Sequence, residues 1–216
     1  MNDWILITGF GTFPGVDVNP TAILMRNLQQ FSIPNIQLKS LVLDVSFTRS
    51  AEQIKTMLNS EISAPLIMLH FGVCRSPKIR IETRAVNSKS ASIPDVDGVF
   101  SQQEPIDFHR GLDDVLYTTV DVEALVSHLK KNGYEAFVSD DAGRYVCNST
   151  YYNVLNMIQD IESRIDCVFV HVPPKNCPLM LDDGKEIIWT EQFLLESAIV
   201  IVRWLLQTRS KIQQLQ

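Results

Sequence analysis

Ala136-Phe-Val-Ser-Asp-Asp-Ala-Gly-Arg-Tyr-Val-Cys147-Asn-Ser-Thr-Tyr-Tyr152 joins a short apolar run to a helical pattern through a glycine turn. We expect a strand over residues 136–139 and a helix from Cys147 to about residue 159. Cys147 would then lie at the first turn of that helix. Free backbone N–H groups and the positive end of the helix dipole favour a thiolate over a thiol there. The segment therefore predicts a strand–helix unit that carries a reactive thiol.

A second apolar run, Cys167-Val-Phe-Val-His171-Val-Pro-Pro174, places an imidazole where a strand over residues 166–172 would end. An imidazole can take the proton of a thiol and later return it to a leaving group. Taken alone, however, one cysteine and one histidine in apolar runs are more often core residues than a catalytic pair. Further segments of the sequence are needed to distinguish a catalytic pair from two core residues.

The rest of the chain alternates strands with helices. We expect strands over residues 4–8, 41–45, 65–72 and 78–84, and helices that begin at Asn19-Pro20, Ser50, Asp121 and Thr190. This order predicts a three-layer α/β/α sandwich around a mostly parallel, mixed sheet, with residues 1–216 as a single domain. Because ligands of such sheets bind beyond the carboxyl ends of the strands, one edge could collect residues 9–13, Cys147 and His171.

Composition and charge exclude several classes of function. The 216 residues are 45% hydrophobic and 20% charged, with a net charge of -6 and no basic cluster, so we expect no nucleic-acid or membrane-surface partner. The four cysteines are too sparse for a disulfide framework. We also expect no signal peptide, because the N-terminus lacks a basic segment before an apolar core, and we therefore expect a cytoplasmic location. The apolar stretch over residues 191–206 is interrupted by Glu196 and predicts a buried helix rather than a membrane span.

Glu82 lies in Lys78-Ile-Arg-Ile-Glu82-Thr-Arg84, a segment that alternates between polar and apolar residues. We expect Ile79 and Ile81 to face inward and Glu82 to lie on the polar face with the two arginines. From the pattern alone, Glu82 is a surface carboxylate paired with arginine.

Three of these segments together resemble the signature segments of the pyroglutamyl peptidase I family. They are Ser139-Asp-Asp-Ala-Gly-Arg-Tyr-Val-Cys147-Asn148, Phe169-Val-His171-Val-Pro-Pro174 and Ile81-Glu82-Thr-Arg-Ala-Val-Asn87. The N-terminal segments Thr8-Gly-Phe-Gly-Thr-Phe-Pro-Gly15 and Asn19-Pro-Thr21 are similar to the opening motif of the same family. The five segments occur in the family's order from the first strand onward, and the combination is highly specific.

This resemblance implies a cysteine exopeptidase that removes an N-terminal pyroglutamyl residue from peptides without a metal or organic cofactor. By position, Cys147 would be the nucleophile, His171 the general base and Glu82 the group that orients the imidazole. The resemblance thus reverses the interpretation of Glu82 as a surface residue. It also implies a substrate pocket formed by Phe10, Phe13, Asn19, Ile93, Tyr145 and Val146. It leaves open a homo-oligomer, either a dimer or a tetramer.

The chain departs from many family members in two loops. Gly11-Thr-Phe-Pro-Gly15 replaces a Glu-Pro-Phe-Gly-Gly run, and Val73-Cys-Arg-Ser-Pro77 replaces a glycine-rich run that precedes the Glu82 strand. The second loop approaches the expected site, so it bears on substrate contacts. The oligomeric state, the natural peptides and any role of Cys74 are not determined by the sequence.

Three alternatives compete with a peptidase. A member of the same fold with impaired or altered catalysis is supported only by the changed loop at residues 73–77. A nucleotide-binding protein is suggested by Gly9-Phe-Gly11 and Asp44, but the helix that should hold a phosphate begins well after the glycines. A metal site of Cys147, Cys167, His171 and Cys177 lacks the usual Cys-x-x-Cys spacing.

Overall fold

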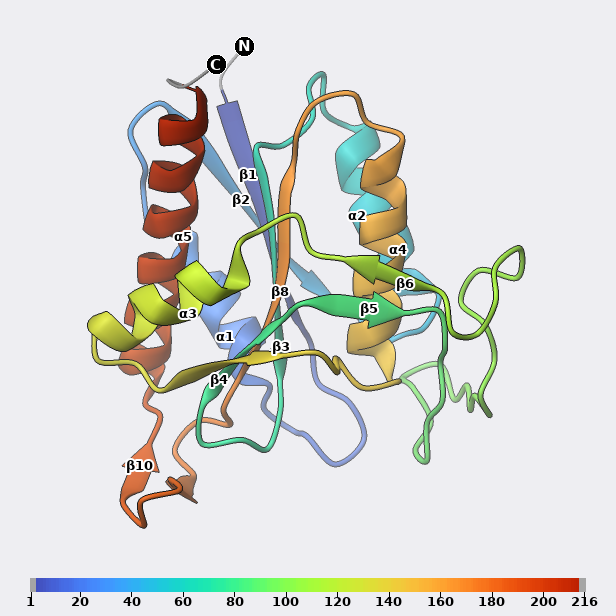
Figure 1. The fold of residues 1–216 in the computed structure, drawn as a ribbon. Coiled ribbons are helices and arrows are strands. Elements are labelled where there is room, and N and C mark those ends of the chain that lie inside the picture. The colour runs from blue at the N-terminus through green and yellow to red at the C-terminus, as the bar shows by residue number, and fades with distance from the viewer. Residues whose placement is uncertain (1–2, 214–216) are drawn as a thin grey trace.

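The computed structural model describes residues 3–213, which form a central six-stranded sheet between two layers of helices (Figure 1). The order is β2-β1-β3-β8-β4-β7, in which β4 runs antiparallel to β8 and the other neighbours are parallel. The strands are β1 (Asp3–Phe10), β2 (Ile36–Leu43), β3 (Ile67–Val73), β4 (Ile79–Glu82), β7 (Ala136–Ser139) and β8 (Asp166–Val172). The predicted α/β/α sandwich with a mixed sheet is confirmed.

Two apolar cores cover the two faces of this sheet. Helices α1 (Pro20–Leu28), α3 (Val122–Lys131) and α5 (Glu191–Gln213) pack on one face, and α2 (Arg49–Asn59) and α4 (Val146–Gln159) pack on the other (Figure 1). Successive side chains of a strand point to opposite faces. In β8, Val168 and Val170 therefore enter the first core, whereas Cys167 and Phe169 enter the second.

Side-chain caps begin three of the helices where the sequence predicts them. Asn19 Oδ1 accepts from Thr21 N at 3.1 Å, Asp121 Oδ1 accepts from Ala124 N at 3.0 Å, and Thr190 Oγ1 accepts from Phe193 N at 3.1 Å. Helix α4 differs, because its first flanking residue, Tyr145, makes no side-chain cap. The amide groups at that end are therefore left without a capping side chain.

Two predicted strands need correction. The strand expected over residues 41–45 covers Ile36–Leu43 instead, because an edge strand tolerates the polar residues that weaken its pattern. The strand expected over residues 78–84 ends at Glu82, and Arg84–Val86 (β5) pairs with Val115–Tyr117 (β6) in a separate two-stranded sheet. The chain passes from one sheet to the other at Thr83. Thr83 N donates to Ser139 O of the central sheet, and Thr83 O accepts from Thr118 N, which follows β6.

A further hairpin, β9 (Pro178–Met180) and β10 (Glu186–Ile188), was not predicted from the sequence. Its strands have three residues each, too few for an alternating pattern to show. Among the described helices, none combines the length and apolar character that crossing a bilayer requires. The apolar stretch over residues 191–206 lies in α5 and packs in the first core, as predicted.

Candidate active site

A pocket of about 150 Å³ opens where β1, β3 and β8 end at their carboxyl edges. It is far smaller than the roughly 300 Å³ at which pockets for drug-sized ligands begin, so it fits a group of about one ring. The pocket is lined by Phe10, Phe13, Asn19, Val45, Val73, Ala142, Tyr145, Cys147 and His171. Six of these residues were predicted from the sequence as site residues.

The thiol and the imidazole of this pocket are brought together over Gly72, the partner of His171 in the parallel pairing of β3 with β8. A Cβ atom placed on Gly72 would lie 2.9 Å from Cys147 Sγ and 3.0 Å from His171 Cδ2. The two side-chain atoms are therefore less than about 6 Å apart. Only a glycine leaves the space above β3 in which sulfur and ring can meet.

The imidazole of His171 is oriented by a hydrogen bond to Glu82. His171 Nδ1 lies 2.7 Å from Glu82 Oε1, and the Glu82 side chain is fully buried. Because a carboxylate oxygen only accepts hydrogen bonds, Nδ1 carries the proton, and Nε2 is the nitrogen left to accept one. The expected polar face of the Glu82 strand is thus wrong for this residue: antiparallel pairing of β4 with β8 turns Glu82 toward the buried imidazole.

Arg80 also contacts this carboxylate, with Nε 3.3 Å from Glu82 Oε1. Its guanidinium is fixed by hydrogen bonds to Ser139 Oγ at 2.9 Å and to the carbonyl of Asp141. Arg84, the other arginine beside Glu82 in the sequence, pairs with Asp140 instead. Glu82 therefore meets both an arginine and the imidazole, and the arginine offsets part of the cost of burying its charge.

Cys147 is the second residue of α4, as the sequence predicts. Burial is the main cause that raises the pKa of its thiol to about 12, and Cys74 and Glu82 add to the rise, while the backbone N–H of Cys147 opposes it. The expected stabilisation of a thiolate by the helix start is therefore outweighed in this protein by desolvation. The thiol has to pass its proton to a base before it can attack.

The walls of the pocket combine apolar rings with one amide. Phe10 is almost fully buried, and the ring of Phe13 lies 6.1 Å from that of Tyr145. Asn19 Nδ2 donates to Gly11 O at 2.9 Å, while its Oδ1 accepts from Thr21. A carboxamide has two N–H donors, so one N–H of Asn19 is left for a ligand.

Two predicted pocket residues lie outside this lining. Val146, the first residue of α4, is completely buried in the second core. Ile93 is 41% exposed in the irregular segment that follows β5. That segment still reaches the site, because Tyr145 Oη donates to Pro94 O at 2.9 Å. A direct role of Ile93 and Val146 in substrate binding stays a prediction.

Sequence reasoning did not identify Arg80, Gly72, Val45 or Ala142 as parts of the site. Gly72 could have been identified from the sequence, because it is a glycine at the end of an apolar strand. In the fold, that strand lies next to the strand of His171. Arg80 was noted beside Glu82, but only as a surface partner. Val45 and Ala142 lie in loops with no pattern that distinguishes a pocket wall from any other contact.

The nucleotide-binding alternative does not agree with this geometry. Gly9 lies inside β1 against the carbonyl of Thr21, and Asp44 pairs with Arg49 at 2.8 Å. The metal alternative fails as well, because Cys167 is enclosed in the second core and Cys177 is exposed. Within residues 3–213 no group of three or more His, Cys, Asp or Glu side chains could hold a metal ion.

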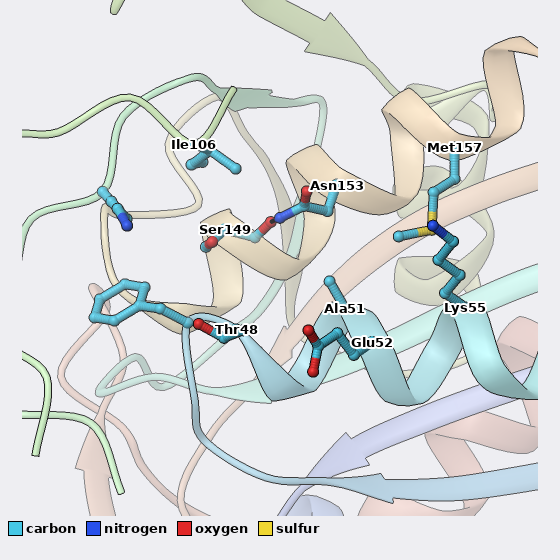
Figure 2. A pocket seen from close by; sticks show the side chains of 10 residues that line it. Thr48, Ala51, Glu52, Lys55, Ile106, Ser149, Asn153 and Met157 are labelled. Atoms are coloured by element: carbon cyan, nitrogen blue, oxygen red, sulfur yellow. Dashed lines mark hydrogen bonds between the residues drawn. The ribbon is translucent and has the colours of Figure 1, made fainter. Parts of the chain in front are cut away.

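Another cavity, of about 300 Å³, lies between α2 and α4 (Figure 2). Figure 2 shows Ser149 and Asn153 of α4 on one side and Glu52 and Lys55 of α2 on the other. It contains neither a thiol nor an imidazole. This cavity therefore offers no cysteine nucleophile.

Residues 3–191 match the sequence model of the family described as pyroglutamyl peptidase. Pyrrolidone-carboxylate peptidase of Thermococcus onnurineus is 32% identical over 78% of this chain and 82% of its own, and that of Halalkalibacterium halodurans is 30% identical over 80% and 85%. The structure of pyrrolidone carboxyl peptidase from Thermococcus litoralis superimposes with a TM-score of 0.86 at 28% identity, covering 98% of this chain and 96% of that one.

Proposed function

The chain belongs to the pyroglutamyl peptidase family, and we propose that it is a cysteine exopeptidase that hydrolyses the amide bond after an N-terminal pyroglutamyl residue. The observation that carries this proposal is that Cys147 and His171 line one small pocket while Glu82 contacts the imidazole of His171. Each comes from a different element, α4, β8 and β4 respectively. A nucleophile, a base and an orienting carboxylate are the parts that acyl transfer needs.

The reaction proceeds by transfer of the acyl group to sulfur. His171 Nε2 takes the thiol proton, and Cys147 Sγ attacks the carbonyl carbon of the pyroglutamyl residue. The resulting oxyanion accepts hydrogen bonds from the uncapped amides at the start of α4, including that of Cys147. His171 then protonates the leaving amine, the C–N bond breaks, and a water molecule hydrolyses the thioester to release pyroglutamate.

The pocket chemistry supports this choice of substrate. The pyroglutamyl ring is small, uncharged and half apolar, and a 150 Å³ pocket between Phe10 and Phe13 matches both its size and its methylene groups. The remaining N–H of Asn19 can donate to the lactam carbonyl. A charged N-terminal residue would lose its hydration in this pocket without gaining a partner of opposite charge.

Glu82 supports the reaction by fixing which nitrogen of His171 carries the proton. With Nδ1 donating to the carboxylate, Nε2 is free to accept, and the carboxylate stabilises the imidazolium that forms. This stabilisation offsets the high pKa that burial gives the thiol. Glu82 is therefore the group that makes proton transfer from a buried cysteine feasible.

We also propose a cellular location, a domain organisation and partners for this protein. Four free cysteines support a cytoplasmic location, and packing of α5 on α1 and α3 supports one domain for residues 1–216. Pyroglutamyl peptides are the expected partners. A dimer or tetramer is supported by Phe100 and Phe108, which are 59% and 75% exposed in one irregular segment.

The test is release of the amine from a pyroglutamyl amide by the purified protein, beside the corresponding prolyl amide. We expect turnover of the pyroglutamyl compound alone, because the prolyl ring carries a charged nitrogen and no lactam carbonyl. Cys147→Ala should abolish turnover while thermal unfolding stays within a few degrees of the wild type. Retained turnover in that variant, or equal turnover of the two amides, would contradict the proposal.

A further inference from the structure

A second cavity of about 450 Å³ adjoins the pocket of Cys147 and shares two of its walls, Phe13 and Val73. It is three times as large as the pocket that would hold the pyroglutamyl ring. Its lining consists of Phe13, Val16, Val18, Pro20, Val73, Cys74, Arg75, Pro174 and Lys175. The two cavities are therefore neighbours, and a peptide held in the first can extend into the second past these shared walls.

The proposed mechanism directs the leaving part of the peptide toward this cavity. His171 has to reach the leaving nitrogen, so the departing chain lies on the side of the imidazole. On that side the backbone runs from His171 to Pro174 and Lys175, which form one wall of the cavity. The loop after β3 forms the opposite wall. A backbone hydrogen bond joins the two walls, since Cys74 N donates to Val172 O at 3.0 Å.

The cavity is positively charged. Arg75 and Lys175 are its charged lining residues, and no acidic side chain lines it. Lys175 is already paired with Glu191. Arg75 is exposed and makes no ion pair with any residue between 3 and 213. Its five donors are therefore available to a carboxylate, which arginine binds with two parallel hydrogen bonds.

We propose that this second cavity binds the part of the peptide that follows pyroglutamate and selects there for a carboxylate held by Arg75. The inference rests on the proposed function. The carboxylate has two sources, the acidic side chain of the next residue or the free C-terminus of a pyroglutamyl dipeptide. The apolar side chains of Val16, Val18 and Pro174 provide contacts for the methylene groups in either case.

Two pairs of substrates distinguish the sources. Pyroglutamyl-alanine and its C-terminal amide differ only in the terminal carboxylate, and the C-terminal amides of pyroglutamyl-glutamate and pyroglutamyl-glutamine differ only in the side chain. In at least one pair, we expect the substrate with the carboxylate to have a kcat/KM about five-fold above that of its neutral partner. This is the effect expected of one partly exposed ion pair. The ratio should approach one in Arg75→Gln and in 1 M salt.

Lys130→Gln is the matched control, because Lys130 is an exposed lysine on α3 that lines neither of the two cavities. It removes the same charge and should leave the ratio as in the wild type. Equal rates for both members of both pairs in the wild type, or a preference that Arg75→Gln leaves intact, would overturn the proposal. Failure of the peptidase function itself would appear separately, as no cleavage of any of the four substrates.

Discussion

Two buried imidazoles lie on neighbouring strands of the same sheet, His70 on β3 and His171 on β8, with the ring of Phe169 near both. His70 Nδ1 is 2.8 Å from the Thr8 hydroxyl, and its Nε2 has no partner among residues 3–213. His171 Nδ1 faces a carboxylate, and its ring borders a pocket. Burial lowers the pKa of His70 to about 3. Both imidazoles are buried, so burial alone does not distinguish a structural histidine from a base. The difference lies in the group that contacts Nδ1 and in whether the ring borders a pocket.

Removing each imidazole is the strongest test of this difference. His171→Gln should lower kcat/KM for a pyroglutamyl amide by about 10⁴-fold, because no base remains for a thiol of high pKa. His70→Gln should keep turnover within a few-fold, since His70 does not line the pocket of Cys147. Comparable losses in the two variants would contradict the assignment of His171 as base.

Glu82, the hydrogen-bond partner of His171, can be replaced by a side chain of nearly the same size. In Glu82→Gln the amide can donate to Nδ1, which favours the tautomer whose Nε2 already carries a proton and cannot accept one. We expect kcat to fall by about 10³-fold with KM within about two-fold, as for loss of an orienting carboxylate. A rise in KM at unchanged kcat would show that Glu82 acts on binding instead.

Gly72 provides a smaller perturbation of the same region. In Gly72→Ala the added methyl group would lie 2.9 Å from Cys147 Sγ and 3.0 Å from Phe169 Cε1, so the thiol has to move. A misplacement of about 1 Å should lower kcat by about 10²-fold. Steady-state kinetics measure this, and a thermal unfolding scan shows whether the variant still folds. A folded variant with normal kcat would show that the thiol tolerates the shift.

The smallest effect concerns stability at the other imidazole. Because the pKa of His70 is about 3 in the folded protein and about 6.5 when unfolded, its contribution is present above pH 6.5 and is lost as the pH falls toward 3. Lowering the pH from 7 to 5 should cost about 2 kcal/mol through His70 alone. Urea unfolding should show this slope in the wild type and a flatter one in His70→Gln. Identical slopes would contradict a neutral buried His70.

The sequence predicted the sandwich and the elements of the thiol and imidazole because their signals are local. Apolar runs, glycine turns and the caps at Asn19 and Asp121 depend on neighbouring residues only. The side on which Glu82 lies could not be predicted in this way. It depends on the antiparallel pairing of β4 with β8, a contact between residues far apart in the chain. The raised pKa of Cys147 was likewise missed, because desolvation depends on packing rather than on helix position.

In the proposed mechanism, turnover depends on the sulfur of Cys147. The most direct measurement treats the wild-type protein with iodoacetamide, follows residual activity on a pyroglutamyl amide, and quantifies by mass spectrometry the modification of each of the four cysteines. Resolution by residue matters because Cys177 is exposed and will also react. We expect activity to fall in proportion to modification of Cys147, and we expect bound pyroglutamate to slow both the modification and the loss of activity. Full activity with Cys147 completely alkylated would contradict it.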